Sequence, residues 1–320
     1  MEIGGALSDA DTTSEPHPAC RGPMMVAPRL MRGSCYITGM SERVVERDGA
    51  ALAVEETGEP HRPPVVLLHG LTATRRYVVM GSKSLERSGH RVISYDARGH
   101  GRSRPAPAPR AYRYEDLGLD LIAVLDQLEI DRAVLAGASM GAHTLLWLAL
   151  RAPERVAGMV VITPAYEPDA NDDPERLARW DALAEGLRSG GVEGFVAAYG
   201  TPAVPEAMRD AVLRVIRQRL ALHEHPEAVA DALSNVPRSR PFGELSELAA
   251  IRAPAVVVAS NDDADPGHPE VVGQEYARAI PGARLITDEP GRSPIAWQGS
   301  QLSKVIAEVA GASGLRGSGG

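Results

Sequence analysis

The chain has 320 residues, of which 44% are hydrophobic, and it carries a formal net charge of −8 at pH 7. A chain of this length buries about three quarters of its unfolded surface, so it can form a sizeable core without disulfide bonds. No stretch approaches the roughly 18 uninterrupted apolar residues of a membrane-spanning helix. The acidic balance disfavours a nucleic-acid surface, which needs clustered Lys and Arg. We therefore expect a globular protein without a membrane or nucleic-acid partner, and the oligomeric state stays open.

The first forty residues differ in composition from the rest of the chain. They mix Gly, Pro, Ser and Thr and hold both cysteines, Cys20 and Cys35. They lack the charged start and apolar run of a secretory signal. We expect residues 1–40 to form a disordered tail and the protein to be cytoplasmic. Because no cysteine follows position 35, we expect neither a disulfide nor a cysteine metal site in the core.

From Ser41 onward, strand and helix patterns alternate. Arg43–Glu46 and Ala51–Glu55 predict two strands joined at Asp48-Gly49, a strong hairpin signal. Short apolar runs bounded by turn residues then predict strands buried on both faces of a parallel sheet. These runs are Val65–Leu68, Val92–Tyr95, Ala133–Ala136, Met159–Ile162, Ala255–Ala259 and Arg284–Ile286. Between these runs, apolar residues recur at helical spacing. The alternation predicts an α/β fold with a mostly parallel central sheet and helices on both faces.

The alternation is interrupted once, over residues 167–249. This stretch lacks buried-strand patterns and reads as amphipathic helices separated by Gly-Gly, Pro and Asn. In open α/β folds the ligand site lies at the carboxyl ends of the strands, so we expect an all-helical lid over that edge. The core would then comprise residues 41–166 and 250–312, followed by a flexible tail over 313–320.

The segment Gly137-Ala138-Ser139-Met140-Gly141 follows a predicted buried strand and opens a helix. This pattern is typical of a nucleophile elbow, in which small neighbours let the backbone bend sharply and expose the hydroxyl, here that of Ser139. His69-Gly70-Leu71-Thr72 follows the first buried strand, where a loop amide could hold a developing oxyanion together with the Met140 amide. We expect His69 itself to be packed, and the loop Asp96–Ser103 to be structural.

These motifs resemble the α/β-hydrolase fold superfamily, of the esterase, haloperoxidase-like and C–C hydrolase kind. The resemblance rests on His69-Gly70, Tyr95–Ser103, the Ser139 turn and Asp265–Pro269, and it spans about residues 41–312. It implies a catalytic chain order of Ser, Asp and His. The family most often places the acid directly before Pro in a D-P-x-x-P segment, which implies Asp265, with Asp263 as the alternative on strand-to-acid spacing.

The histidine of this order is missing. Where relatives commonly read Gly-His-Ser-Pro after the last strand, this chain has Arg292, and no histidine follows His268. A guanidinium stays protonated and cannot remove a proton from Ser139. We do not expect another histidine to replace the base: His143 should pack behind the Ser139 turn, His223 should face solvent, and His268 should belong to the start of the next helix.

Three functions remain open. The first is a serine-hydrolase-like enzyme that attacks an ester, thioester or activated carbonyl of a medium-sized, largely apolar small molecule. Its nucleophile would be Ser139, with the amides of Leu71 and Met140 as oxyanion hole, and its chemistry would be impaired or altered by Arg292. The second is a non-hydrolytic lyase, cyclase or isomerase that uses Arg292 electrostatically, and the third is a non-catalytic ligand-binding member. No phosphate loop or metal-ligand cluster is visible, so we expect no cofactor and no metal.

Overall fold

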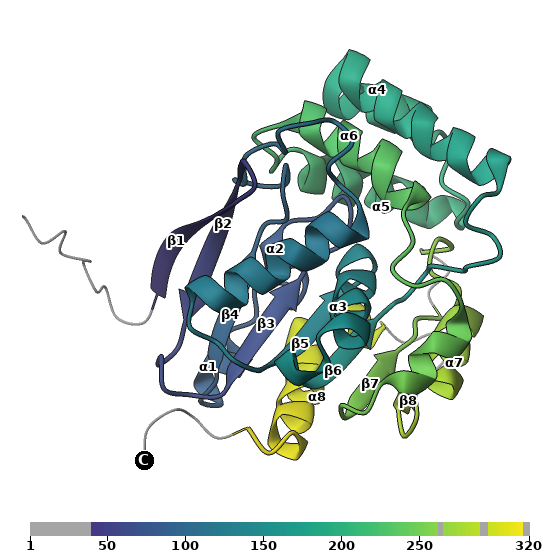
Figure 1. Cartoon of the computed structure of the whole chain (residues 1–320). Coiled ribbons are helices and arrows are strands. Elements are labelled where there is room, and N and C mark those ends of the chain that lie inside the picture. Colours follow the sequence, from purple (N-terminus) through teal and green to yellow (C-terminus); the bar gives the residue numbers. More distant parts are fainter. Residues whose placement is uncertain (1–39, 262–264, 289–293, 316–320) are drawn as a thin grey trace, which may run out of the picture. The chain divides into compact units, whose positions relative to one another are not determined.

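The computed structural model describes residues 40–261, 265–288 and 294–315. Within these residues, eight strands form one sheet in the order β1-β2-β4-β3-β5-β6-β7-β8 (Figure 1). The strands are β1 (Met40–Arg47), β2 (Ala50–Thr57), β3 (Pro64–Leu68), β4 (Arg91–Tyr95), β5 (Ala133–Ala138), β6 (Val156–Ile162), β7 (Ala255–Val258) and β8 (Arg284–Ile286). The pairs β1–β2 and β2–β4 are antiparallel and the remaining pairs are parallel, which confirms a mostly parallel sheet.

Helices cover both faces of the sheet. One face packs against α2 (Tyr114–Gln127), α3 (Met140–Arg151) and α7 (Glu270–Ala279), and the other against α1 (Ser84–Arg87) and α8 (Gly299–Ala312). Neighbouring residues of β3 alternate between these two cores: Val66 joins the first and Val65 the second. A strand that is buried on both faces requires a continuous apolar run, which is the pattern the sequence shows. Short 3-10 helices complete the described chain: η1 (Arg75–Tyr77), η2 (Pro153–Arg155), η3 (Val236–Arg238), η4 (Leu245–Ala250) and η5 (Ile295–Trp297).

The predicted strands are all present, and one differs in its environment. The hairpin forms around Asp48 and Gly49, both with positive φ, and its strands extend beyond their predicted ends. The prediction that Arg284–Ile286 would be buried is wrong. In this strand, β8, Leu285 is 37% exposed, because β8 lies at the edge of the sheet and pairs only with β7.

Three helices occupy the chain between β6 and β7: α4 (Pro174–Tyr199), α5 (Glu206–Leu220) and α6 (Pro226–Asn235). The side chain of Asp173 caps the start of α4 by accepting a hydrogen bond of 3.0 Å from the Glu175 amide. At Gly191, whose φ is 59°, α4 is kinked. The helices share a small core of their own that includes Leu187, Phe195, Ile216, Leu220 and Leu233.

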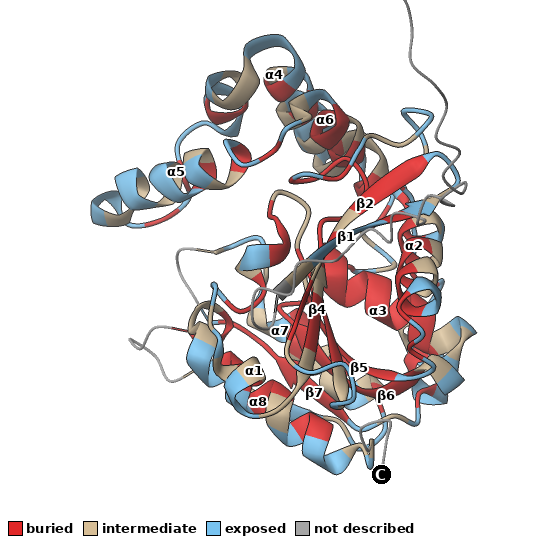
Figure 2. Cartoon of the chain, turned by 90° about the vertical axis from the view of Figure 1, so that its left-hand side faces the viewer, coloured by how far each residue is buried: buried red, intermediate tan, exposed pale blue. Residues whose placement is uncertain are grey.

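Figure 2 shows α4, α5 and α6 at one end of the sheet, and Ala228 and Ala232 of α6 join the core on the α2–α3 face. We call these three helices the helical segment. No helix in the described part of the chain is long and apolar enough to cross a membrane.

Candidate functional site

Ser139 sits on a sharp turn between β5 and α3, with φ 50° and ψ −113°. A non-glycine residue with positive φ is strained, and such strain persists only where the surroundings hold it in place. Here the Ser139 amide donates to the Ile162 carbonyl at 3.0 Å, and the Ser139 carbonyl accepts from the His143 amide at 3.0 Å. A Cβ at Gly137 would clash with the Gly141 backbone, and one at Gly141 would clash with the Leu68 carbonyl. The two glycines are therefore required for this turn.

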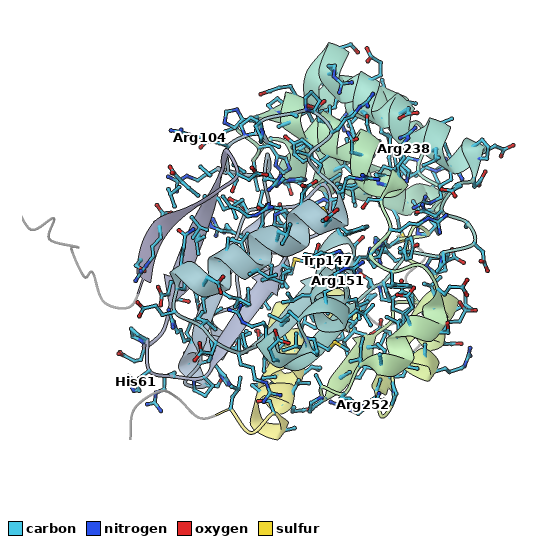
Figure 3. All side chains as sticks on the ribbon, in the orientation of Figure 1. His61, Arg104, Trp147, Arg151, Arg238 and Arg252 are labelled. Carbon is cyan, nitrogen blue, oxygen red and sulfur yellow. The ribbon has the colours of Figure 1, made fainter. Side chains whose placement is uncertain are left out.

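The helix that follows Ser139 is firmly anchored. The Trp147 indole occupies the space that a Cβ on Gly118 of α2 would need. One turn further, the Arg151 guanidinium lies 4.6 Å from the centre of the Trp147 ring and donates to the Pro241 carbonyl at 3.1 Å (Figure 3). These contacts fix the direction of α3 and with it the position of Ser139.

His143 packs behind the turn, as predicted. It is 4% exposed, and its Nε2 accepts hydrogen bonds from the amides of Ala165 and Tyr166 at 3.2 and 3.1 Å. Its Nδ1 lies 3.0 Å from the Tyr114 hydroxyl. Burial lowers the pKa of His143 to about 3, so the ring is neutral and serves as a structural acceptor.

The loop after β3 lies against the Ser139 turn. A Cβ built on Gly70 would stand 3.6 Å from the Ser139 Cβ. Among the described residues, no hydrogen bond occupies the amides of Leu71 and Met140 or the hydroxyl of Ser139. Met140 is also the first residue of α3, where the helix dipole favours negative charge. Two free donors beside a hydroxyl can stabilise an oxyanion formed at that hydroxyl.

His69 holds this loop in place. It is 2% exposed, its Nε2 accepts from the Ala97 amide at 2.9 Å, and its Nδ1 lies 2.8 Å from the Gly70 carbonyl. Burial, reinforced by nearby His100, lowers the pKa of His69 to about 4. The prediction that His69 is a packed side chain is confirmed.

Two more histidines extend this arrangement toward the helical segment. The rings of His69 and His100 are 5.2 Å apart, and those of His100 and His223 are 5.5 Å apart. His100 Nε2 lies 2.7 Å from the Leu71 carbonyl, and His223 Nδ1 accepts from the Gly101 amide at 2.8 Å. We call these three rings the histidine column.

The expectation that His223 faces solvent is wrong, since it is 8% exposed. The glycine-rich loop after β4 leaves the Gly101 amide without a strand partner, and a buried amide needs an acceptor. The imidazole of His223 supplies that acceptor, and its Nε2 lies 3.2 Å from the Thr72 carbonyl.

The loop from Asp96 to Ser103 is structural, as predicted. The Asp96 carboxylate accepts from the amides of Arg75 and Arg102 at 2.8 and 3.1 Å. Arg98 is fully buried and forms a two-pronged ion pair with Asp120 of α2, at 2.7 and 2.6 Å. This network fixes the two loops that flank the Ser139 turn.

Asp265, which the resemblance implies as the catalytic acid, is paired with a histidine. His268 Nδ1 lies 2.8 Å from Asp265 Oδ2, and the two side chains are 21% and 22% exposed. Both line a cavity of about 540 Å³ between the loop after β7 and residues 203–209 of the helical segment. The buried hydroxyl of Ser260 at the start of that loop has no hydrogen-bond partner among the described residues.

A cation of the helical segment lies near this pair. Arg219 of α5 interacts electrostatically with Asp265, Tyr199 and Tyr77, and its Nε is buried without a partner. Burial lowers the pKa of Arg219, while Asp265 raises it. No sequence pattern indicated Arg219, because its interaction with Asp265 depends on how α5 packs in the folded chain.

The structure thus places the loop that carries Leu71 against the turn of Ser139 and Met140, and it places Asp265 on the loop after β7. Asp263 and Arg292 lie outside the described residues, as do residues 1–39 and 316–320 of the expected tails. In the described ranges, no group of three or more His, Cys, Asp or Glu side chains could hold a metal ion.

Known proteins share this architecture and parts of this sequence. The chain is 32% identical over 217 residues to a putative carbamate hydrolase, RutD, of Variovorax paradoxus, covering 67% of this chain and 79% of that protein. It is 26% identical to a putative 2-succinyl-6-hydroxy-2,4-cyclohexadiene-1-carboxylate synthase of Bacillus subtilis, covering 82% and 95%. The solved structure of a thermophilic esterase from Thermogutta terrifontis superposes with a TM-score of 0.69 at 27% identity, covering 86% and 100%. A profile of the alpha/beta hydrolase fold matches residues 63–298, and the chain belongs to this family.

Proposed function

We propose that the protein is a serine-hydrolase-like enzyme that attacks an ester, thioester or activated carbonyl of a medium-sized small molecule. Ser139 is the nucleophile, the amides of Leu71 and Met140 bind the oxyanion, and Asp265 is the acid, with Asp263 as the alternative. The observation that supports this most is the strained Ser139 turn with two unoccupied amides beside its hydroxyl. Backbone strain of this kind is common where it serves catalysis.

The chemistry of this enzyme is impaired or altered, because Arg292 stands at the family's histidine position. Arginine remains protonated below about pH 12 and cannot act as the base at that position. If no other group replaces the base, turnover falls on the order of 10⁶-fold, which corresponds to about 8 kcal/mol. The oxyanion hole and substrate binding alone still leave roughly 10³–10⁴ over water.

The substrate is a small molecule with a substantial apolar part. Leu71, on the loop after β3, packs against the apolar core of the helical segment, which supports an apolar environment beside the site. Relatives named as a putative carbamate hydrolase and an esterase support cleavage of a carbonyl derivative. These names refer to the substrates of those relatives and do not identify the substrate of this protein.

One observation favours the second candidate, a non-hydrolytic lyase, cyclase or isomerase. Arg219 is a half-buried cation without an ion-pair partner among the described residues, and it interacts electrostatically with Asp265. With Arg292, it would provide positive charge for an enolate-like intermediate. A relative named as a synthase also covers most of the chain. In this case Ser139 would hydrogen-bond to the substrate and would not attack it.

Covalent labelling of Ser139 distinguishes the hydrolase from the non-hydrolytic enzyme. The parent, Ser139→Ala and Arg292→His proteins are incubated with a fluorophosphonate and followed by intact mass, and p-nitrophenyl esters serve as substrates. We expect Arg292→His to label at Ser139 and to hydrolyse the esters faster than the parent, and Ser139→Ala to do neither. If Arg292→His is folded and remains unlabelled, Ser139 is not a nucleophile, and the hydrolase proposal is wrong.

A further inference from the structure

The Asp265–His268 pair has the orientation that a catalytic acid and base require. In a serine triad the acid binds Nδ1 of the imidazole, which leaves Nε2 to take the proton of the serine. Here Oδ2 of Asp265 lies 2.8 Å from Nδ1 of His268. Nε2 of His268 has no hydrogen-bond partner in the described part of the chain, and the ring lines the 540 Å³ cavity.

The sheet places this pair at the same edge as Ser139. Ala138, Ile162 and Val258 are in register at the ends of β5, β6 and β7. Ser139 and the loop that carries His268 therefore leave neighbouring positions of one edge, two strands or about 10 Å apart at their origins. After burial, His268 is the next largest cause of the lowered pKa of His143, which is one helical turn beyond Ser139.

The pair lies in the wall of an open cavity. The side chains of His268 and Asp265 are 21% and 22% exposed. Ala203, Val204, Pro205 and Arg209 line the same cavity. A small molecule in the cavity can therefore contact the imidazole.

We infer that His268, oriented by Asp265, is the general base for Ser139 in this protein, in place of the residue after the last strand. This rests on the proposed function of Ser139 as nucleophile. As Ser139 Oγ bonds to the carbonyl carbon, its proton moves to Nε2 of His268 and the carbonyl electron pair moves to the oxygen between the two free amides. The carbon–oxygen bond to the leaving group then breaks, and that oxygen takes the proton from Nε2. A water repeats both steps and releases Ser139 and the acid.

No hydrogen bond joins His268 to Ser139 in the described residues, and this does not exclude the role. Catalytic hydrogen bonds are often long in the absence of substrate and tighten in the reacting complex. Because Asp265 and His268 lie on a loop ahead of α7 and outside regular structure, their approach to Ser139 requires no change in the sheet.

The test measures the rate of fluorophosphonate labelling at Ser139 in the parent, His268→Gln, His268→Ala and His61→Gln proteins. His61 precedes β3 and lies at the opposite end of the sheet from the helical segment (Figure 3), so it is the matched control. We expect the parent and His61→Gln to label at the same rate and His268→Gln to label about 10²- to 10⁴-fold more slowly. Added imidazole should restore labelling of His268→Ala, which a purely structural role would not allow.

Two results would overturn the assignment. One is labelling of His268→Gln at the parent's rate. The other is a parent that does not label while Arg292→His does, because the serine hydrolase would then be silenced at position 292 and His268 would contribute nothing. If neither the parent nor a folded Arg292→His protein labels, the proposed nucleophile itself is wrong, and the role of His268 falls with it.

Discussion

Three buried histidines should make the folded protein lose stability in mild acid. His69, His143 and His223 are 2%, 4% and 8% exposed, and each uses one ring nitrogen to accept a backbone amide. Protonation would turn that acceptor into a donor facing another donor. Burial lowers the pKa of His69 to about 4 and those of the other two to about 3. The Asp96 carboxylate only partly opposes this shift at His69 and His223.

The sign and the size of this change in unfolding free energy follow from the difference in proton binding between the folded and unfolded chains. Each folded pKa lies below the value of about 6.5 for an exposed histidine, so the unfolded chain binds more protons in mild acid. The contribution of these neutral rings to the unfolding free energy is fully present above about pH 6.5, and it is lost as the pH falls toward 4. Between pH 7.5 and 5.5, each ring costs about 1.4 kcal/mol of unfolding free energy, which gives about 4 kcal/mol for the three. His100 acts in the same direction, because burial also lowers its pKa.

The assay is urea unfolding, followed by tryptophan fluorescence at pH 7.5, 6.5 and 5.5. Near pH 5.5, the slope of the unfolding free energy with pH should correspond to uptake of about three protons or more, because His100 adds to the uptake by the other three rings. His223→Gln, which removes one ring, should lower this uptake by about one proton, and His61→Gln should leave it unchanged. A parent slope below one proton, or the same slope in His223→Gln as in the parent, would refute the reasoning.

Two further predictions concern the residues that hold the site. Asp120→Asn removes the carboxylate charge that pairs most closely with the fully buried guanidinium of Arg98, leaving Asp116 at 3.8 Å, and should cost about 3–5 kcal/mol of unfolding free energy in urea. Glu308→Gln breaks an exposed ion pair of similar length on α8 and should cost less than about 1 kcal/mol in the same assay, so equal effects of the two changes would contradict this account. Gly141→Ala places a methyl group against the Leu68 carbonyl and should lower both the thermal midpoint and labelling at Ser139, whereas a normal midpoint with full labelling would show that the turn tolerates a side chain.

Local sequence patterns predicted much of the fold. The apolar runs located every strand of the sheet from β3 onward, and Asp48-Gly49 located the hairpin, because strand burial and turn geometry depend on neighbouring residues. The exposed β8 was mispredicted, since an edge position depends on the order of strands in the sheet.

The candidate site was predicted only where its residues are close to one another in the sequence. Gly137 and Gly141 indicated the Ser139 turn, and the structure confirms the turn's geometry. The burial of His223 could not be predicted, because its partner amide is 122 residues away in the chain. The contact of Asp265 with His268 spans three residues, yet sequence alone does not say whether the side chains meet.

The histidine column has a mechanical consequence for the helical segment. Between α5 and α6, His223 bonds the Gly101 amide, and the Glu224 amide donates to the Gly101 carbonyl at 2.9 Å. This junction is therefore fastened to the same loops that position the Leu71 amide, while Val215 on α5 is 47% exposed. The position of the junction between α5 and α6 is therefore coupled to the position of the loop that carries Leu71, through one imidazole and one backbone hydrogen bond.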